Sequence, residues 1–210
     1  MEEVIKEITS KEAWEFLKDK HYAGRRPPIS KAFSLEISNQ IMAVCTFGKP
    51  ASRPLCVGIC GKEYADNVFE LNRLCRLEEY TGQLSHFVST CLKKLKKENW
   101  IIVSYSDTDM HHAGYIYQAC NFLYTGLTKE RTDKYVEGNK HCRHYKEEEQ
   151  GKYRRVRSAK HRYVYFASYK SSLKRKWKEA LNYPILPYPK TLNKNYVLGF
   201  VQSPRLVKVR

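Results

Sequence analysis

Residues 67–127 alternate between two periodicities, and this alternation limits the chain to folds that pack helices against a sheet. The run "NVFELNRLCRL" alternates in period two, which is typical of a strand. The next run, "GQLSHFVSTCLKKLKKEN", has an apolar stripe at helical spacing, and residues 100–103 form an apolar run typical of a buried strand. "HAGYIYQACN" then predicts a short helix, and "FLYTGLT" predicts another strand.

The N-terminal third adds one helix and a hairpin. Ser10 is a capping residue for a helix over "SKEAWEFLKDKHY", which Gly24 and two prolines bring to an end. "AFSLEISNQIMAVCTFGKP" contains two apolar runs joined by three polar residues, the pattern of an antiparallel hairpin. The order helix, hairpin, strand, helix, strand, helix, strand predicts an α/β fold with a mixed sheet flanked by helices.

Arg73 stands out within the strand pattern of residues 67–77. Strict alternation places it on one face with Phe69, Leu71 and Cys75, where an apolar side chain is expected. A buried cation is costly unless it is paired. Arg73 therefore either forms a structural pair with a carboxylate or lies in a ligand-binding cleft, and we expect the cleft.

Polar groups crowd the turn after the buried strand, in "SYSDTDMHHAGY". Ligand sites in open α/β sheets lie at the carboxyl ends of strands, which is where Asp107 stands. Asp107 either caps the following turn or serves as a base, an orienting group or a metal ligand. We expect a functional role, because Ser106, Thr108 and Asp109 could cap the turn equally well. His111 and His112 are adjacent and point apart on a helix, so one of them is expected to cap or line the cleft.

The charge of the chain points to a polyanionic partner. The sequence has 38 Lys and Arg against 22 Asp and Glu, a net charge of +16, so nucleic acid is the expected partner. After about residue 129, "YRRVRSAKHRYVYF" interleaves cations with aromatic rings, which suits phosphate contacts and base stacking, and "HRYVYF" predicts a strand at the sheet edge. A solvated charge run is the alternative.

These patterns divide the chain into two parts. Residues 1–128 form the predicted catalytic core, and residues 129–210 form a basic, tyrosine-rich C-terminal part that completes the sheet and binds DNA. The expected DNA contacts come from the loop after the first helix, from the basic tract and from the helix "KSSLKRKWKEAL". They are Arg25, Arg26, Arg154, Arg155, Arg157, Lys160, Arg162, Lys174, Arg175 and Lys176.

The cysteines and the N-terminus indicate the compartment. Seven cysteines without paired Cys-x-x-Cys spacing predict reduced thiols that fill the core of a cytosolic protein. "HCRHYK" gathers His141, Cys142 and His144 but lacks a second paired element, so a charged segment is expected rather than a zinc site. The N-terminus is charged, and no apolar run is long enough to span a membrane.

The run from "NVFELNRLCRL" to "NFLYTG" resembles the core of the GNAT N-acetyltransferase fold. That resemblance implies a V-shaped cleft and a helix N-terminus that binds the diphosphate of an acyl-coenzyme A. The family's glycine-rich phosphate loop is absent, since "EEYTGQLSHF" offers one glycine between strand and helix. Backbone amides at a helix N-terminus can still bind phosphate. The expected cofactor contacts are Gly82, Gln83 and Leu84.

A narrower resemblance covers most of the chain. The stretches "KHYAGRRPP", "FELNRLCRL", "SYSDTDMHHAGYIYQACNFLYTG", "KHRYVYF" and "YPILPYPK" together resemble the Mom family of phage DNA-modification proteins, a divergent branch of the GNAT fold. The resemblance implies conversion of adenine in double-stranded DNA to its N6-carbamoylmethyl form, which protects phage DNA from restriction in the host cytoplasm. It implies that the catalytic residues are His21, Tyr22, Arg73, Asp107 and Tyr117.

The resemblance also bears on cofactors. An iron requirement proposed for the family makes His21 and Asp107 candidate metal ligands. The group donor is expected to be an acyl-CoA-like or another activated compound. From the residues alone, His21 could instead interact with a helix dipole, and Tyr117 could pack in the core.

Two other functions remain open at this level. One is an acyl-CoA-dependent N-acetyltransferase that acts on an amine outside DNA, and the missing glycine-rich loop counts against it. The other is a DNA-binding protein that kept the fold without the chemistry. Neither the sequence context in DNA nor the oligomeric state follows from the sequence.

Overall fold

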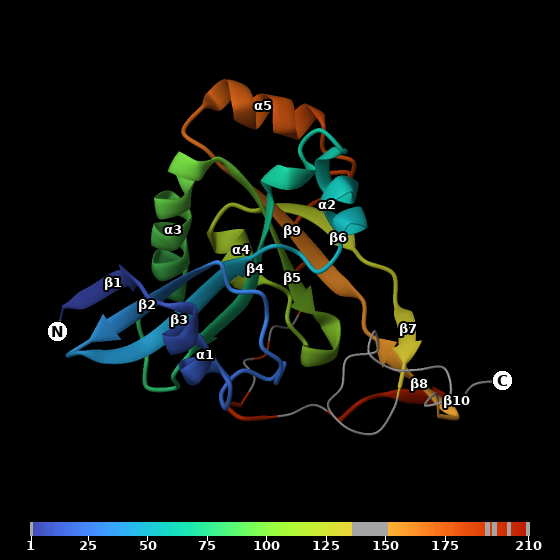
Figure 1. The fold of residues 1–210 in the computed structure, drawn as a ribbon, viewed down its shortest axis with the longest axis horizontal. Helices are drawn as coiled ribbons and strands as arrows, with labels where there is room; N and C mark the ends of the chain where they lie inside the picture. The colour runs from blue at the N-terminus through green and yellow to red at the C-terminus, as the bar shows by residue number, and fades with distance from the viewer. Residues whose placement is uncertain (1, 136–150, 192–193, 195–196, 201–202, 209–210) are drawn as a thin grey trace.

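The computed structural model describes residues 2–135, 151–191, 194, 197–200 and 203–208. Within these residues the chain forms a seven-stranded mixed sheet, in the order β1-β2-β3-β4-β5-β9-β6, with helices on both faces. A three-stranded sheet, β10-β8-β7, lies beside it at the lower right of Figure 1. The predicted α/β fold with a mixed, helix-flanked sheet is confirmed. The His141, Cys142 and His144 cluster lies outside the described residues.

The elements have the following bounds. The strands of the large sheet are β1 Glu3–Glu7, β2 Lys31–Ile37, β3 Gln40–Gly48, β4 Val68–Arg76, β5 Trp100–Asp107, β9 Lys160–Ala167 and β6 Leu123–Leu127. Those of the small sheet are β7 Arg131–Lys134, β8 Tyr153–Arg157 and β10 Leu206–Lys208. The helices are α1 Ser10–Leu17, α2 Arg53–Cys60, α3 Leu84–Leu95, α4 Tyr115–Ala119 and α5 Ser171–Glu179.

Apolar side chains cover both faces of the large sheet. On one face α3 and α4 pack against Ile102 and its neighbours, and on the other α1, α2 and α5 pack in two further clusters. Ile101 and Val103 belong to the second face, as the period-two alternation of a strand requires. The continuous apolar run of β5 is therefore buried on both sides, as the sequence predicts.

The start of the chain differs from the prediction. Thr9, and not Ser10, caps α1: its side chain accepts a hydrogen bond from the Glu12 amide at 3.2 Å, and the Glu12 carboxylate accepts one from the Thr9 amide at 2.8 Å. This reciprocal capping box fixes the first turn. Strand β1 and helix α2 were not predicted. Strand β1 has five residues and α2 contains a proline in its first turn, so neither shows a clear periodic pattern.

A β-bulge at Asn72 reverses the alternation along β4. Phe47 of β3 pairs with Leu71 while the adjacent Thr46 pairs with Arg73, so Asn72 is an extra residue. Its side chain accepts a hydrogen bond from Thr46 Oγ1 at 2.6 Å and donates one to the Pro28 carbonyl at 2.8 Å. Leu71 packs with α3, whereas Cys75 packs with α1. The prediction that both share one face with Arg73 is wrong.

Strands β4 and β5 form the one parallel pair of the described sheet, and they separate partway along. Their register runs from Val68 opposite Ile101 to Leu71 opposite Ser104 and goes no further. Beyond that point β4 stays paired with β3, while β5 stays paired with β9 as far as Asp107. The two strands therefore open a V at their carboxyl ends.

The C-terminal part enters the middle of the large sheet. Strand β9 lies between β5 and β6, so the prediction of an edge strand is wrong. Its register places Lys160 opposite Asp107 and Ala167 opposite Trp100. Helix α5 follows the Ala167 end, at the top of Figure 1, and lies at the opposite end of the sheet from the V.

The cysteines that the structure describes are buried and unbonded to one another. They are Cys45, Cys56, Cys60, Cys75, Cys91 and Cys120. The prediction of core-filling thiols is confirmed for these six. In the described part of the chain, no helix is long and apolar enough to cross a membrane.

Candidate active site

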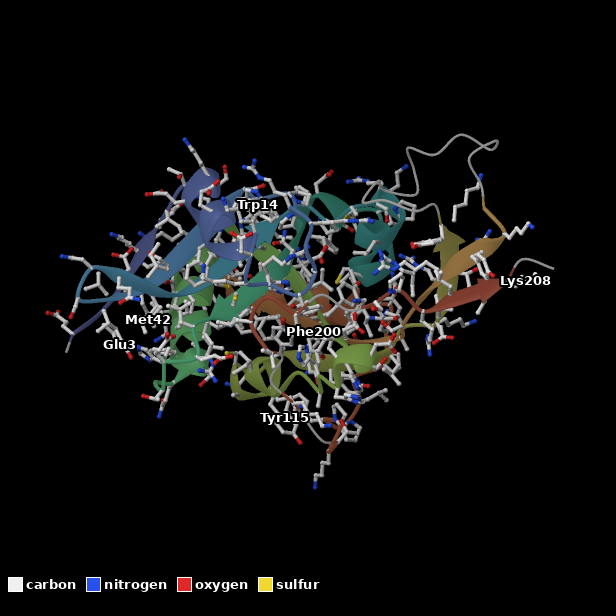
Figure 2. The ribbon with its side chains drawn as sticks, turned by 90° about the horizontal axis from the view of Figure 1, so that it is seen from below. Glu3, Trp14, Met42, Tyr115, Phe200 and Lys208 are labelled. Atoms are coloured by element: carbon white, nitrogen blue, oxygen red, sulfur yellow. The ribbon has the colours of Figure 1, made fainter. Side chains whose placement is uncertain are left out.

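A cavity of about 1410 Å³ fills the V between β4 and β5. Its walls come from the loop after α1, from the ends of β4 and β5, from α4 and from the small sheet. The C-terminal segment borders it, because the Lys194 amide donates to the His111 carbonyl and the Gly199 amide to the Lys20 carbonyl. In Figure 2, Phe200 accordingly lies between Trp14 of α1 and Tyr115 of α4.

The structure brings the five residues expected to be catalytic to this one cavity. His21 and Tyr22 follow α1, Arg73 follows the bulge in β4, Asp107 ends β5 and Tyr117 lies on α4. These elements are far apart in the sequence, and the divergence of β4 and β5 allows their side chains to meet.

Asp107 is a buried carboxylate that neighbouring groups hold tightly. Its Oδ1 accepts hydrogen bonds from the Asp109 amide at 3.0 Å and Ser158 Oγ at 2.6 Å, and its Oδ2 lies 2.5 Å from Lys160 Nζ. Burial alone would raise the pKa of Asp107, but the charge and hydrogen bond of Lys160 and the other donors outweigh it and lower the pKa. Asp107 therefore caps the turn and orients Lys160, and it is a weak proton acceptor.

His21 is neutral in this environment. Burial lowers its pKa to about 3, and the positive charges of Arg73, His112 and Lys160 add to the effect. The ring nitrogen Nδ1 accepts a hydrogen bond from the Ala23 amide at 3.1 Å, which places the proton of a neutral ring on Nε2. His21 is thereby set to donate a hydrogen bond rather than to accept a proton.

Tyr22 connects the two sides of the cleft. Its ring stacks on His21 at 4.5 Å between centroids and meets the edge of His112 at 5.6 Å. Burial, together with the negative charge of Asp107, raises the pKa of Tyr22 to about 12. The phenol is therefore protonated at neutral pH. His112 lines the cavity and His111 is exposed, as expected for one of the two.

Arg73 ties the loop after α1 to the strand. Its guanidinium donates from Nη1 to the Asn72 carbonyl at 2.6 Å and from Nη2 to the Arg25 carbonyl at 2.9 Å. Because the bulge turns Arg73 to the α1 face, it lies in the cavity near His21 and Glu70 rather than among the apolar residues beneath α3. The alternative of a structural pair with Asp107 is not what the structure shows, since Asp107 pairs with Lys160.

Glu70 is a site residue that the sequence did not reveal. It lines the cavity on β4, and within the described residues its carboxyl group makes neither a hydrogen bond nor an ion pair. Burial raises the pKa of Glu70 to about 7, although Arg73 and Lys160 partly offset the effect. Glu70 lies two residues before the bulge. Strict alternation places Glu70 and Arg73 on opposite faces of β4, so the sequence pattern concealed that both line the cavity.

Tyr117 approaches from the other side of the sheet. Its ring packs against Phe122 and Tyr163, with centroids 5.4 and 5.3 Å apart, and its hydroxyl group lies near Ser104. Burial raises the pKa of Tyr117 well above its usual range. Since Ser104 marks the point where β4 and β5 separate, the hydroxyl lies where the V begins.

His21 and Asp107, the predicted iron ligands, do not fit a metal site. No group of three or more His, Cys, Asp or Glu able to hold a metal occurs in the part of the chain that the structure describes. Both Asp107 oxygens are engaged by protein donors, and Nδ1 of His21 is engaged by a backbone amide. We therefore assign no step to a metal.

The three expected cofactor contacts do not all lie in the cavity. Leu84, at the start of α3, lines the cavity, whereas Gly82 and Gln83 are not among its lining residues. A side chain at Gly82 would meet the Tyr80 ring at 2.6 Å and a Glu3 carboxylate oxygen at 2.7 Å, so protein already fills that space. An acyl-CoA-like donor stays a prediction.

The expected DNA contacts divide into two groups. Arg25, Arg26, Arg155, Arg157 and Lys160 line the cavity. The others do not: Arg154 is bonded to Thr132 within the small sheet, buried Arg162 is bonded to Thr125 and covered by the Tyr183 ring, and Lys174, Arg175 and Lys176 lie on α5. Arg162 is therefore a structural residue, and the prediction of a DNA contact there is wrong.

Replacing Lys160 with methionine is expected to reduce the free energy of unfolding by about 1–3 kcal/mol at pH 7, because it leaves the buried Asp107 carboxylate without its cation. The side chain of Lys160 is 39% exposed, which keeps the loss towards the lower value. Since the folded-state pKa of Asp107 is lowered, this stabilisation is complete above the unfolded-state pKa of about 4 and is lost as the pH falls further.

Urea denaturation at pH 7 and at pH 3 measures the effect. Lys176→Met, at an exposed position on α5, serves as the control and should leave stability nearly unchanged. A loss of equal size at both pH values would show that Lys160 stabilises the fold by other contacts.

Comparison with known proteins identifies relatives. A sequence model of the Mom protein family matches residues 2–190, and no curated protein matches the chain. The chain is similar to an N-acetyltransferase from Staphylococcus aureus Mu50, at 11% identity and a TM-score of 0.50, covering 80% of this chain and 100% of that one. It is similar to a protein from Salmonella typhimurium whose structure contains acetyl-CoA, at 6% identity and a TM-score of 0.50, covering 81% and 97%. The chain thus has the GNAT fold.

Proposed function

Since the chain belongs to the Mom protein family, we propose that it is a transferase that converts adenine in DNA to its N6-carbamoylmethyl form and so protects phage DNA from restriction. The resemblance supplies the reaction, and the cavity supports it. Double-stranded DNA is the proposed substrate, and the target base leaves the stack to enter the site, as a buried reaction centre requires.

The charge of the cavity carries the proposal. Among the described residues that line it, eleven are Lys or Arg and four are Asp or Glu. A concave surface with this excess concentrates an anionic substrate and contacts its phosphates. Such a lining repels a small cationic amine.

The chemistry requires a proton acceptor next to the exocyclic amine, which is a poor nucleophile. A bond forms between N6 and a carbon of the activated donor, the bond from that carbon to the donor's leaving group breaks, and the N6 proton passes to Glu70. A base with a pKa of about 7 suits this step near neutral pH. The neutral His21, through its Nε2 proton, and the phenol of Tyr117 donate hydrogen bonds to the reacting groups in this proposal.

Plasmid DNA from bacteria that express the chain tests the proposal. Restriction enzymes with adenine in their recognition sites should fail to cut DNA from cells with the wild-type chain and should cut DNA from cells with Asp107→Ala. Lys174→Gln, on the remote α5, should protect as well as the wild type. Full cleavage despite folded wild-type protein would contradict the proposal, and oligonucleotide binding would then separate a DNA-binding protein from an acetyltransferase for another amine.

A further inference from the structure

Three guanidinium groups gather on one wall of the cavity. Arg155 and Arg157 are two residues apart on β8, so their side chains project from the same face of the small sheet. Arg25 reaches the same place from the loop after α1, and all three line the cavity. The wall joins two segments that are more than a hundred residues apart in the sequence.

Arg155 forms no hydrogen bond or ion pair among the described residues, because the nearby carboxylate of Asp133 pairs with Arg157 instead. Arg157 pairs with Asp133 at 3.0 Å, and Arg154 donates to Oγ1 and the carbonyl of Thr132 at 2.8 and 3.0 Å. The half-buried guanidinium of Arg155 makes no hydrogen bond or ion pair within the described chain, and burial together with the charges of Arg157 and Arg25 lowers its pKa. A partly desolvated cation beside two like charges is unfavourable unless an anion joins it.

We propose that Arg155, flanked by Arg25 and Arg157, forms a phosphate-binding site on the wall of the cavity. A guanidinium binds a phosphate with two parallel hydrogen bonds, and Arg155 keeps its donors available for such a ligand. This inference rests on the proposed function in one respect: a phosphodiester next to the target adenine is the expected occupant. A phosphate carried by the group donor has the same chemistry and could occupy the same site.

Two neighbouring residues provide a matched pair of variants. Arg155→Gln should weaken binding of a fluorescently labelled DNA duplex about tenfold or more and reduce the slope of log affinity against log salt by about one. Arg154→Gln removes the same charge from the other face of the strand and should change affinity far less. Thermal unfolding of both variants checks that the small sheet stays folded.

Coenzyme A and inorganic pyrophosphate serve as the second probe. If Arg155→Gln weakens binding of these compounds and leaves DNA binding intact, the site holds a phosphate of the donor. If Arg155→Gln and Arg154→Gln bind every probe equally, the inference is overturned. Because binding is measured apart from the reaction, wild-type DNA affinity that depends on Arg155 would uphold the site even if adenine were never modified.

Discussion

Replacing Glu70 with glutamine is expected to slow adenine modification by about 10²–10⁴-fold, the usual contribution of a positioned general base. The substitution preserves the shape of the side chain and removes its ability to accept a proton. Because the pKa of Glu70 is about 7, the wild-type rate should rise with pH through that value, and the remaining rate of Glu70→Gln should not. Nucleoside mass spectrometry over a range of pH values measures both.

A stability measurement separates loss of a base from loss of the fold. The folded-state pKa of Glu70 lies above its unfolded value, so the ionised carboxylate costs stability increasingly as the pH rises from about 4.5 through 7. Glu70→Gln should therefore unfold at a higher temperature than the wild type at pH 8 and at a similar one at pH 4. The exposed Glu63→Gln is the control. An unchanged modification rate in stable Glu70→Gln protein would exclude Glu70 as the base.

Replacing Arg73 with methionine is expected to reduce modification at least 100-fold, because the Arg25 carbonyl of the loop after α1 loses the donor that joins it to β4. The loop that carries His21 and Tyr22 then loses its bond to Arg73 and keeps the bond from Asn72 to the Pro28 carbonyl. A misplacement of about 1 Å in a site can cost this much. Arg73→Lys should restore little activity, since an ammonium group lacks the planar, forked geometry of a guanidinium.

Hydrogen exchange supplies a readout that a general loss of stability would not reproduce. Amides of residues 21–26 should exchange faster in Arg73→Met, while those of β5 and β9 keep their protection. Arg26→Gln, in the same loop, should keep its exchange pattern close to wild type. Uniformly faster exchange throughout the sheet would instead mean that Arg73 stabilises the whole fold.

Local patterns predicted most of the large sheet, and the family resemblance implied the five expected catalytic residues that the structure brings to one cavity. The apolar run of β5 and the stripe of α3 are strong signals, since burial on a regular element leaves a regular pattern. The bulge at Asn72 could not be predicted, because it inserts one residue whose partners, Thr46 and Pro28, are distant in the sequence. That single residue decides on which face Arg73 lies.

The charges were harder to assign than the helices and strands. A basic tract looks the same whether its cations meet solvent, phosphate or protein, so Arg162 and Lys160 were grouped with Arg155. In the structure, Arg162 is buried against Thr125 and Tyr183, and Lys160 is paired with Asp107. The placement of β9 between β5 and β6 causes both differences, and it depends on long-range strand pairing that no local pattern contains.

Nucleoside mass spectrometry of plasmid DNA from bacteria that express the chain tests the central claim most directly. We expect a deoxyadenosine heavier by a carbamoylmethyl group with the wild-type chain and with Lys174→Gln, and ordinary deoxyadenosine with Glu70→Gln. Ordinary deoxyadenosine from cells that contain folded wild-type protein would contradict the claim that this cavity modifies adenine in DNA.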